Sequence, residues 1–314
     1  MFVLLVWLPY IIAKYIAFHK LGLGIVDPAQ HNGVGAFFSN LFLVNALNVH
    51  DYLSWNFPAW SISVEFFTYL IFFACISLFR QFNDLVLCLG LSALFYFLLY
   101  TNNPISLLKT YDWGLVRCLG GFFLGAAVYR LTQLIIVKFS TAEATLVEVL
   151  SVGLMIVLVS SSITVNYQLA AFGSFALVIL IFSVQEVGLL TRMLTLKPLL
   201  FLGALSYSIY MIHALIFVIS ATLGTNLFKI PTKIINNSYG ESTVLVTPYA
   251  DLITLVLLTI VIGLSYLTYR YIEVPWRDKF RAYAKKPQAL KPTATLRRPQ
   301  NYSTADGSGL RRSE

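Results

Sequence analysis

Four apolar segments of this chain carry polar side chains at helical spacing, and the first of these stripes contains a carboxylate. Ser61, Glu65 and Tyr69 recur every four residues, which places them on one face of a helix, just after Trp60. A carboxylate within a membrane span is costly and is a functional candidate by default. Glu65 could position or deprotonate a hydroxyl group, and the alternative role is a structural ion pair.

The second stripe contains an arginine. Arg117, Gly121 and Gly125 share a helix face, and the two glycines form a small-xxx-small packing surface. Arg117 enters its apolar run from the same end as Glu65, so we expect that the two side chains can meet. Arg117 could bind an anionic group or hold Glu65, and pairing alone would be a sufficient reason for its presence.

The other two stripes lie toward the end of the chain. Ser206, Tyr210 and His213 fall at i, i+4 and i+7, so they also share one face. His213 is either a functional group or a hydrogen-bonded core histidine. Tyr269 and Glu273 share a face near the end of the last apolar run, where an interfacial ion pair is the alternative to a functional role.

The composition shows what must position these stripes. Apolar residues make up 58% of the 314 residues and charged residues only 11%, against about 25% charged in soluble domains. The mean hydropathy is +0.76. A surface exposed to water on all sides is therefore excluded, and we expect an integral, multi-pass membrane protein.

We predict an all-α fold, a polytopic transmembrane helix bundle of about eight spans with cytoplasmic N- and C-termini. A membrane helix needs roughly 20 mostly apolar residues. The predicted spans are 1–18, 62–79, 84–100, 115–135, 145–163, 167–184, 199–224 and 250–272.

The distribution of Lys and Arg sets the predicted orientation. With the basic end in the cytoplasm, sixteen Lys/Arg lie on the cytoplasmic side and four in the external loops. The longest external loop, from His19 to about Trp60, is either functional or an interfacial segment anchored by Trp55 and Trp60. We divide the chain into a membrane domain, 1–280, and a disordered basic cytoplasmic tail, 281–314.

The stripes together resemble the acyltransferase 3 family of polytopic membrane O-acyltransferases, over about residues 1–280. Three segments carry the resemblance, and a fourth, Arg117 to Gly125, matches more weakly. Their residues, in chain order, are Trp60, Ser61 and Glu65; then Gly203, Ser206, Tyr207, Tyr210 and His213; then Glu273 and Pro275.

The resemblance implies transfer of an acyl group, usually acetyl, from cytoplasmic acyl-CoA to a hydroxyl of a cell-surface polysaccharide or another glycan or lipid acceptor. It implies Glu65 and His213 as catalytic candidates. It implies a bacterial inner membrane, and acyl-CoA, the acceptor and the bilayer as partners, with no nucleic acid, metal or further cofactor. The substrate-binding candidates are Trp60, Ser61, Tyr69, Arg117, Ser206, Tyr207, Tyr210 and Glu273.

The family pattern also contains two earlier helices, which carry a histidine and are followed by an R-x-x-R motif. Neither precedes the first apolar run here, which begins at Met1. We therefore expect an N-terminally truncated relative of the family, and one possibility is that the chain is an inactive fragment. The alternative function is a transporter or flippase of a glycan or small solute, because buried Glu, Arg and His also suit transport pathways. The acceptor, the acyl group and the oligomeric state stay open.

Overall fold

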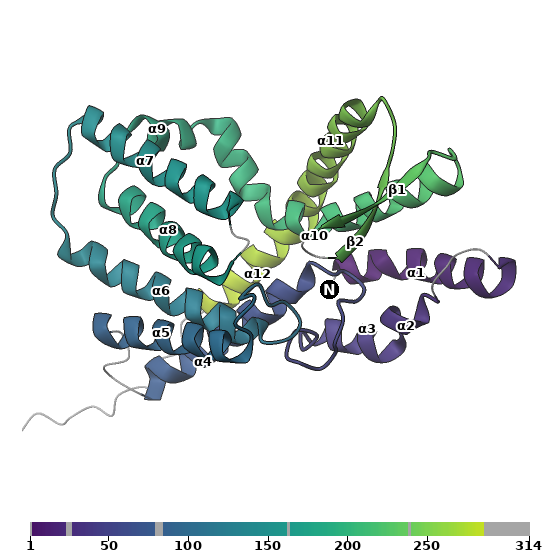
Figure 1. The fold of residues 1–314 in the computed structure, drawn as a ribbon, viewed down its shortest axis with the longest axis horizontal. Coiled ribbons are helices and arrows are strands. Elements are labelled where there is room, and N and C mark those ends of the chain that lie inside the picture. Colours follow the sequence, from purple (N-terminus) through teal and green to yellow (C-terminus); the bar gives the residue numbers. More distant parts are fainter. Residues whose placement is uncertain (1, 23–26, 79–83, 162–163, 238–239, 286–314) are drawn as a thin grey trace, which may run out of the picture. The chain divides into compact units, whose positions relative to one another are not determined.

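A computed structural model describes residues 2–22, 27–78, 84–161, 164–237 and 240–285, and its eight long apolar helices confirm the predicted fold class (Figure 1). Only the predicted span ends at residues 1, 79 and 162–163 lie outside the described residues. The candidate spans are Val3–Leu21, Ala59–Leu78, Leu85–Asn102, Gly114–Leu134, Thr141–Ser160, Val165–Val184, Lys197–Asn226 and Ala250–Tyr283.

In order along the chain, the helices begin with one span and two short segments: α1 (Phe2–Leu21), α2 (Ala29–Asn32) and α3 (Val34–Leu41). The central spans are α4 (Ala59–Leu78), α5 (Leu85–Asn102), α6 (Gly114–Leu134), α7 (Thr141–Ser160) and α8 (Val165–Val184). The short α9 (Leu189–Leu194) precedes α10 (Lys197–Asn226) and α11 (Ala250–Thr268).

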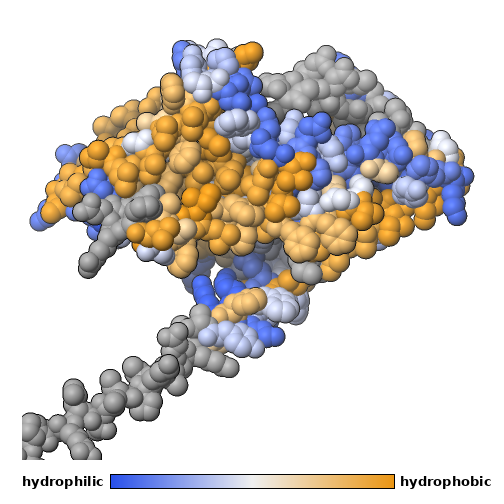
Figure 2. Space-filling view, turned by 90° about the horizontal axis from the view of Figure 1, so that it is seen from below, coloured by the Kyte–Doolittle hydropathy of each residue, from blue (hydrophilic) through white to orange (hydrophobic). Residues whose placement is uncertain are grey.

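Local signals explain where several helices begin. The Asp84 carboxylate accepts hydrogen bonds from the backbone N–H groups of Val86 and Leu87 at 2.9 and 3.3 Å, which caps α5. Ser140 and Glu143 form a reciprocal capping box at the start of α7. The surfaces of the helices are largely apolar, and Figure 2 shows hydrophobic residues over much of the face in view, as a bilayer environment requires.

Helix α6 packs against α4, α5 and α8. The α5 contact is close because Gly120 has no side chain: a Cβ there would lie 3.2 Å from the Tyr96 ring. Ser92 on α5 donates a hydrogen bond to the Gly120 carbonyl at 2.9 Å. The Tyr96 ring in turn stacks on Phe172 of α8, with centroids 5.0 Å apart. These contacts hold α6, which carries Arg117, against its neighbours.

The connection between α1 and α4 folds into the protein rather than forming an open loop. Its α2 and α3 are followed by an irregular segment, and Ala36 and Trp55 join a buried cluster with Trp7 of α1 and Ala214 of α10. Asn40 donates hydrogen bonds to the Ala36 carbonyl and to Ser54 at 2.9 and 2.8 Å. Non-helical backbone is tolerated next to lipid only when protein surrounds it in this way.

The connection between α10 and α11 contains a β-hairpin that the sequence analysis did not predict. Strands β1 (Thr232–Asn237) and β2 (Gly240–Leu245) are antiparallel, and their register runs from Thr232 opposite Leu245 to Asn237 opposite Gly240. This hairpin is the only sheet within the described residues, so the fold remains essentially all-α.

The chain divides into two compact units, Met1–Tyr269 and Arg270–Glu314. In chain order, α11 is followed by a π-helical turn, η1 (Tyr269–Glu273), and by α12 (Val274–Lys285). The predicted disordered tail, 281–314, overlaps the end of α12, so residues 281–285 are helical. Residues 286–314 lie outside the described residues.

Candidate functional site

A cavity of about 390 Å³ lies between the first turns of α4 and the first turns of α6. It brings together polar residues from two of the sequence stripes. The α4 side contributes Trp60, Ser61, Val64, Glu65 and Tyr69, and the α6 side contributes Gly114, Arg117, Cys118, Gly121 and Phe122.

Among the described residues that line this cavity, Glu65 is the only carboxylate. Its side chain is exposed at the protein surface, and the Tyr69 hydroxyl, one turn along α4, donates a hydrogen bond to Oε1. Within the described residues, Tyr69 is the one hydrogen-bond donor to the Glu65 carboxylate. Glu65 therefore keeps acceptor capacity that a ligand hydroxyl can use.

Arg117 lies on the opposite wall and is held against an aromatic ring. Its guanidinium carbon is 4.8 Å from the centre of the Trp60 ring, a cation–π distance. The expectation that Arg117 and Glu65 can meet is consistent with their positions, since both line the same cavity. A planar cation with several donors suits an anionic group or a developing oxyanion.

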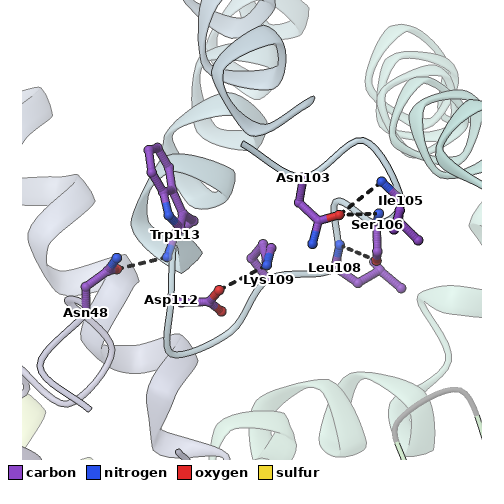
Figure 3. Close-up of polar contacts among 8 residues, drawn as sticks. All are labelled: Asn48, Asn103, Ile105, Ser106, Leu108, Lys109, Asp112 and Trp113. Atoms are coloured by element: carbon purple, nitrogen blue, oxygen red, sulfur yellow. Dashed lines mark hydrogen bonds and ion pairs between the residues drawn. The ribbon is translucent and has the colours of Figure 1, made fainter. Parts of the chain in front are cut away.

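Polar contacts hold the loop that precedes α6, the helix that carries Arg117 (Figure 3). The Trp113 backbone has a positive φ of 55°, and its N–H donates to the Asn48 side chain at 2.9 Å. Lys109 and Asp112 form an ion pair at 3.0 Å. Because Asn48 belongs to the connection between α1 and α4, this connection anchors the start of α6.

Tyr210 ties the beginning of α4 to the middle of α10. Its hydroxyl donates to the Pro58 carbonyl at 2.9 Å and accepts from the Ser61 hydroxyl at 2.9 Å. Ser61 lines the cavity, so the third sequence stripe reaches the site through this contact. Tyr210 is therefore a positioning residue in this structure rather than a lining residue.

The remaining predicted residues do not line the cavity. The Nδ1 atom of His213 lies 3.3 Å from the Ile209 carbonyl, which can only accept, and the imidazole packs between Tyr210 and Phe217. Ser206 and Tyr207 are exposed on α10. Glu273 belongs to the second unit of the chain. The catalytic role assigned to His213 stays a prediction.

A second intramembrane carboxylate was not singled out from the sequence. Glu148 of α7 is fully buried and accepts hydrogen bonds from the Gln185 side chain (2.7 Å), the N–H groups of Leu190 and Thr191 (2.9 and 3.2 Å) and the Thr191 hydroxyl (2.5 Å). It satisfies the first N–H groups of α9, which have no partner within that helix. A single Glu inside an apolar run was the signal that could have found it.

Two other cavities bear on the choice of site. A cavity of about 420 Å³ continues along α6 from Phe122 and is lined by Phe72, Gly125, Ala126 and Tyr129. A larger one, of about 580 Å³, lies between α1 and α3 and is lined by apolar residues with Tyr15 and Asn32. None of the described residues that line these two cavities is a carboxylate or a basic side chain, so the α4–α6 cavity is the best candidate for chemistry.

Within the described residues, no group of three or more His, Cys, Asp or Glu is placed to hold a metal ion. Comparisons of the chain with protein-family models, curated proteins and solved structures found no match. The function proposed below therefore rests on the side chains of the cavity and on their geometry.

Proposed function

We propose that this chain is a membrane O-acyltransferase, similar to the acyltransferase 3 family, and that the α4–α6 cavity holds the acceptor hydroxyl. The observation that carries the proposal is the gathering of Glu65, Tyr69 and Arg117 in one cavity, although α4 and α6 are separated in sequence by α5. Acyl transfer to a hydroxyl uses a proton acceptor and a group that stabilises negative charge. A carboxylate and a guanidinium that line the same small cavity can fill these two roles.

The reaction is an exchange of one bond for another. The acceptor O–H attacks the carbonyl carbon of the acyl-CoA thioester, the C–S bond breaks, and the products are an O-ester and coenzyme A. Glu65 accepts the hydroxyl proton as the new bond forms, and this proton then passes to the departing thiolate, which regenerates the Glu65 carboxylate. Arg117 stabilises the negative charge on the thioester oxygen or binds an anionic group of the acceptor.

The four histidines of the chain, His19, His31, His50 and His213, lie outside this cavity. Glu65 is therefore the proton acceptor that this chain itself supplies there. The predicted orientation is compatible with this role, because the starts of α4 and α6 face the external side, where a glycan or lipid acceptor would approach. We propose the same bacterial inner membrane location on the strength of the family resemblance.

The test uses membranes from cells that produce the full chain, incubated with acetyl-CoA labelled in the acetyl group. We expect label in a product that mild base releases, as an O-ester requires, and a lower yield when the acyl donor is omitted. Membranes with an empty vector are the control. Label no higher than in those membranes would contradict acyl transfer, and acceptor movement without acyl-CoA would favour the transporter alternative.

A further inference from the structure

Helix α12 has an aromatic face with no role in the proposed reaction. Trp276, Phe280 and Tyr283 are 54%, 65% and 59% exposed. At about 100° per residue these three positions lie within one narrow sector of the helix. The Trp276 and Phe280 rings stack with centroids 6.0 Å apart, so the face is continuous at its start.

The rest of α12 is basic. Its twelve residues include Arg277, Lys279, Arg281 and Lys285 against a single acidic residue, Asp278. Arg277 and Arg281 lie on the side away from the aromatic sector, while Lys279 borders it, with Nζ 5.0 Å from the centre of the Trp276 ring. An aromatic face beside basic residues is the pattern of helices that lie in a membrane interface.

The position of α12 in the chain places it at such an interface. Helix α11 has 19 residues, which corresponds to about 28 Å of helix. This length nearly matches the roughly 30 Å hydrocarbon core of a bilayer, and η1 adds a further turn. Because α11 alone is about as long as this core, we expect α12 to start at the level of the lipid headgroups.

We propose that the chain changes direction at η1, because π-helical turns are common sites of helix kinks. In this proposal α12 lies on the membrane surface and binds anionic phospholipids, with the aromatic face toward the acyl chains and the basic side chains on the headgroups. Charge complementarity identifies this occupant, since the helix carries four cations and one anion. Each Lys or Arg near an anionic leaflet strengthens attachment about fivefold. This inference does not depend on acyl transfer.

The experiment places an environment-sensitive fluorophore at one of two positions of the full chain in lipid nanodiscs. Phe280→Cys puts the label on the aromatic face, and Asp278→Cys puts it about 160° away on the basic side. The unsubstituted chain, treated in the same way, measures labelling of Cys75, Cys88 and Cys118. The nanodiscs contain phosphatidylcholine alone or with anionic phosphatidylglycerol.

We expect an aqueous quencher to reach the label at position 278 but not at position 280, and the difference to be largest with phosphatidylglycerol. Adding Arg281→Gln and Lys285→Gln to the Phe280→Cys chain should weaken the protection, about fivefold for each charge removed. Equal quenching at both positions would overturn the proposal. Protection at position 280 that is the same in both lipid compositions would overturn the recognition of anionic lipid.

Discussion

Glu65 and Glu148 both lie beyond the first turn of an apolar helix, and their surroundings are opposite. Glu148 is fully buried and accepts hydrogen bonds from the side chains of Gln185 and Thr191 and from two backbone N–H groups of α9. Glu65 is exposed in a cavity and accepts one hydrogen bond, from Tyr69. The same side chain therefore serves as a structural anchor in one place and is available to a ligand in the other.

The comparison of Glu65 with Glu148 indicates which charged residues within membrane spans are available for function. Both residues are costly to insert, which makes each a functional candidate from sequence alone. When donors of the protein fill the hydrogen-bonding capacity of a carboxylate, these hydrogen bonds offset the free-energy cost of placing its charge in the membrane. A carboxylate that lines a cavity beside an arginine can still accept hydrogen bonds from a ligand. Glu65 is such a carboxylate.

The largest effect on stability should come from removing the anchor. Glu148→Ala leaves the Gln185 amide and the N–H groups of Leu190 and Thr191 without their acceptor, at about 1–3 kcal/mol for each orphaned donor. Thermal unfolding in detergent, followed by the loss of the monodisperse gel-filtration peak, measures this. The exposed neighbour Glu186→Ala is the control, and an unfolding temperature equal to that of the unsubstituted chain would contradict the anchoring role.

The space around the anchor provides a second test. An added Cβ at Gly188 would overlap the Glu148 carboxylate, so Gly188→Ala should displace the start of α9 and cost about 1–3 kcal/mol. Gly125→Ala is the matched control, because nothing lies within 4 Å of a Cβ there. The two unfolding temperatures are compared directly, and equal values would show that α9 does not need this contact.

In the cavity, Arg117→Lys should reduce acyl transfer while leaving the protein folded. Lysine keeps the charge but loses the planar contact with Trp60, which is worth about 0.5–2 kcal/mol, or roughly a twofold to thirtyfold lower initial rate. Arg192→Lys, on the exposed surface of α9, serves for comparison. An unchanged rate in the Arg117 variant would remove this residue from the substrate site.

The smallest effect concerns the link between α10 and α4. Tyr210→Phe loses the hydrogen bonds to the Pro58 carbonyl and from Ser61, at about 1 kcal/mol. We expect an unfolding temperature a few degrees lower and a smaller loss of transfer than in Arg117→Lys. Tyr100→Phe on the exposed side of α5 is the control. A transfer rate as low as that of a cavity variant would indicate that Tyr210 contacts substrate.

The eight spans could be predicted because hydropathy and helix length are local properties of the sequence. The same holds for the shared face of Ser61, Glu65 and Tyr69, which follows from a spacing of four residues. The polar stripes also led to Arg117, which lines the cavity with Glu65. These predictions needed no knowledge of which helices are neighbours.

Other features depend on contacts between distant residues. The connection between α1 and α4 was predicted as a long external loop. The sequence did not show that Trp55 and Ala36 of this connection pack with α1 and α10, or that Asn48 anchors α6. The role of Glu148 depends on donors about 40 residues away. The spacing of the third stripe did not show that Tyr210 is hydrogen-bonded to Ser61 on another helix. Nor did it show that His213 contacts the Ile209 carbonyl of its own helix.

The most direct test measures acetyl transfer and unfolding temperature together for Glu65→Gln and Glu148→Gln. We predict that Glu65→Gln keeps the unfolding temperature of the unsubstituted chain and loses transfer by about 100-fold or more, as the removal of a general base does. Glu148→Gln should instead lower the unfolding temperature. A Glu65→Gln protein that transfers acetyl groups at the unsubstituted rate would contradict the assignment of the α4–α6 cavity as the active site.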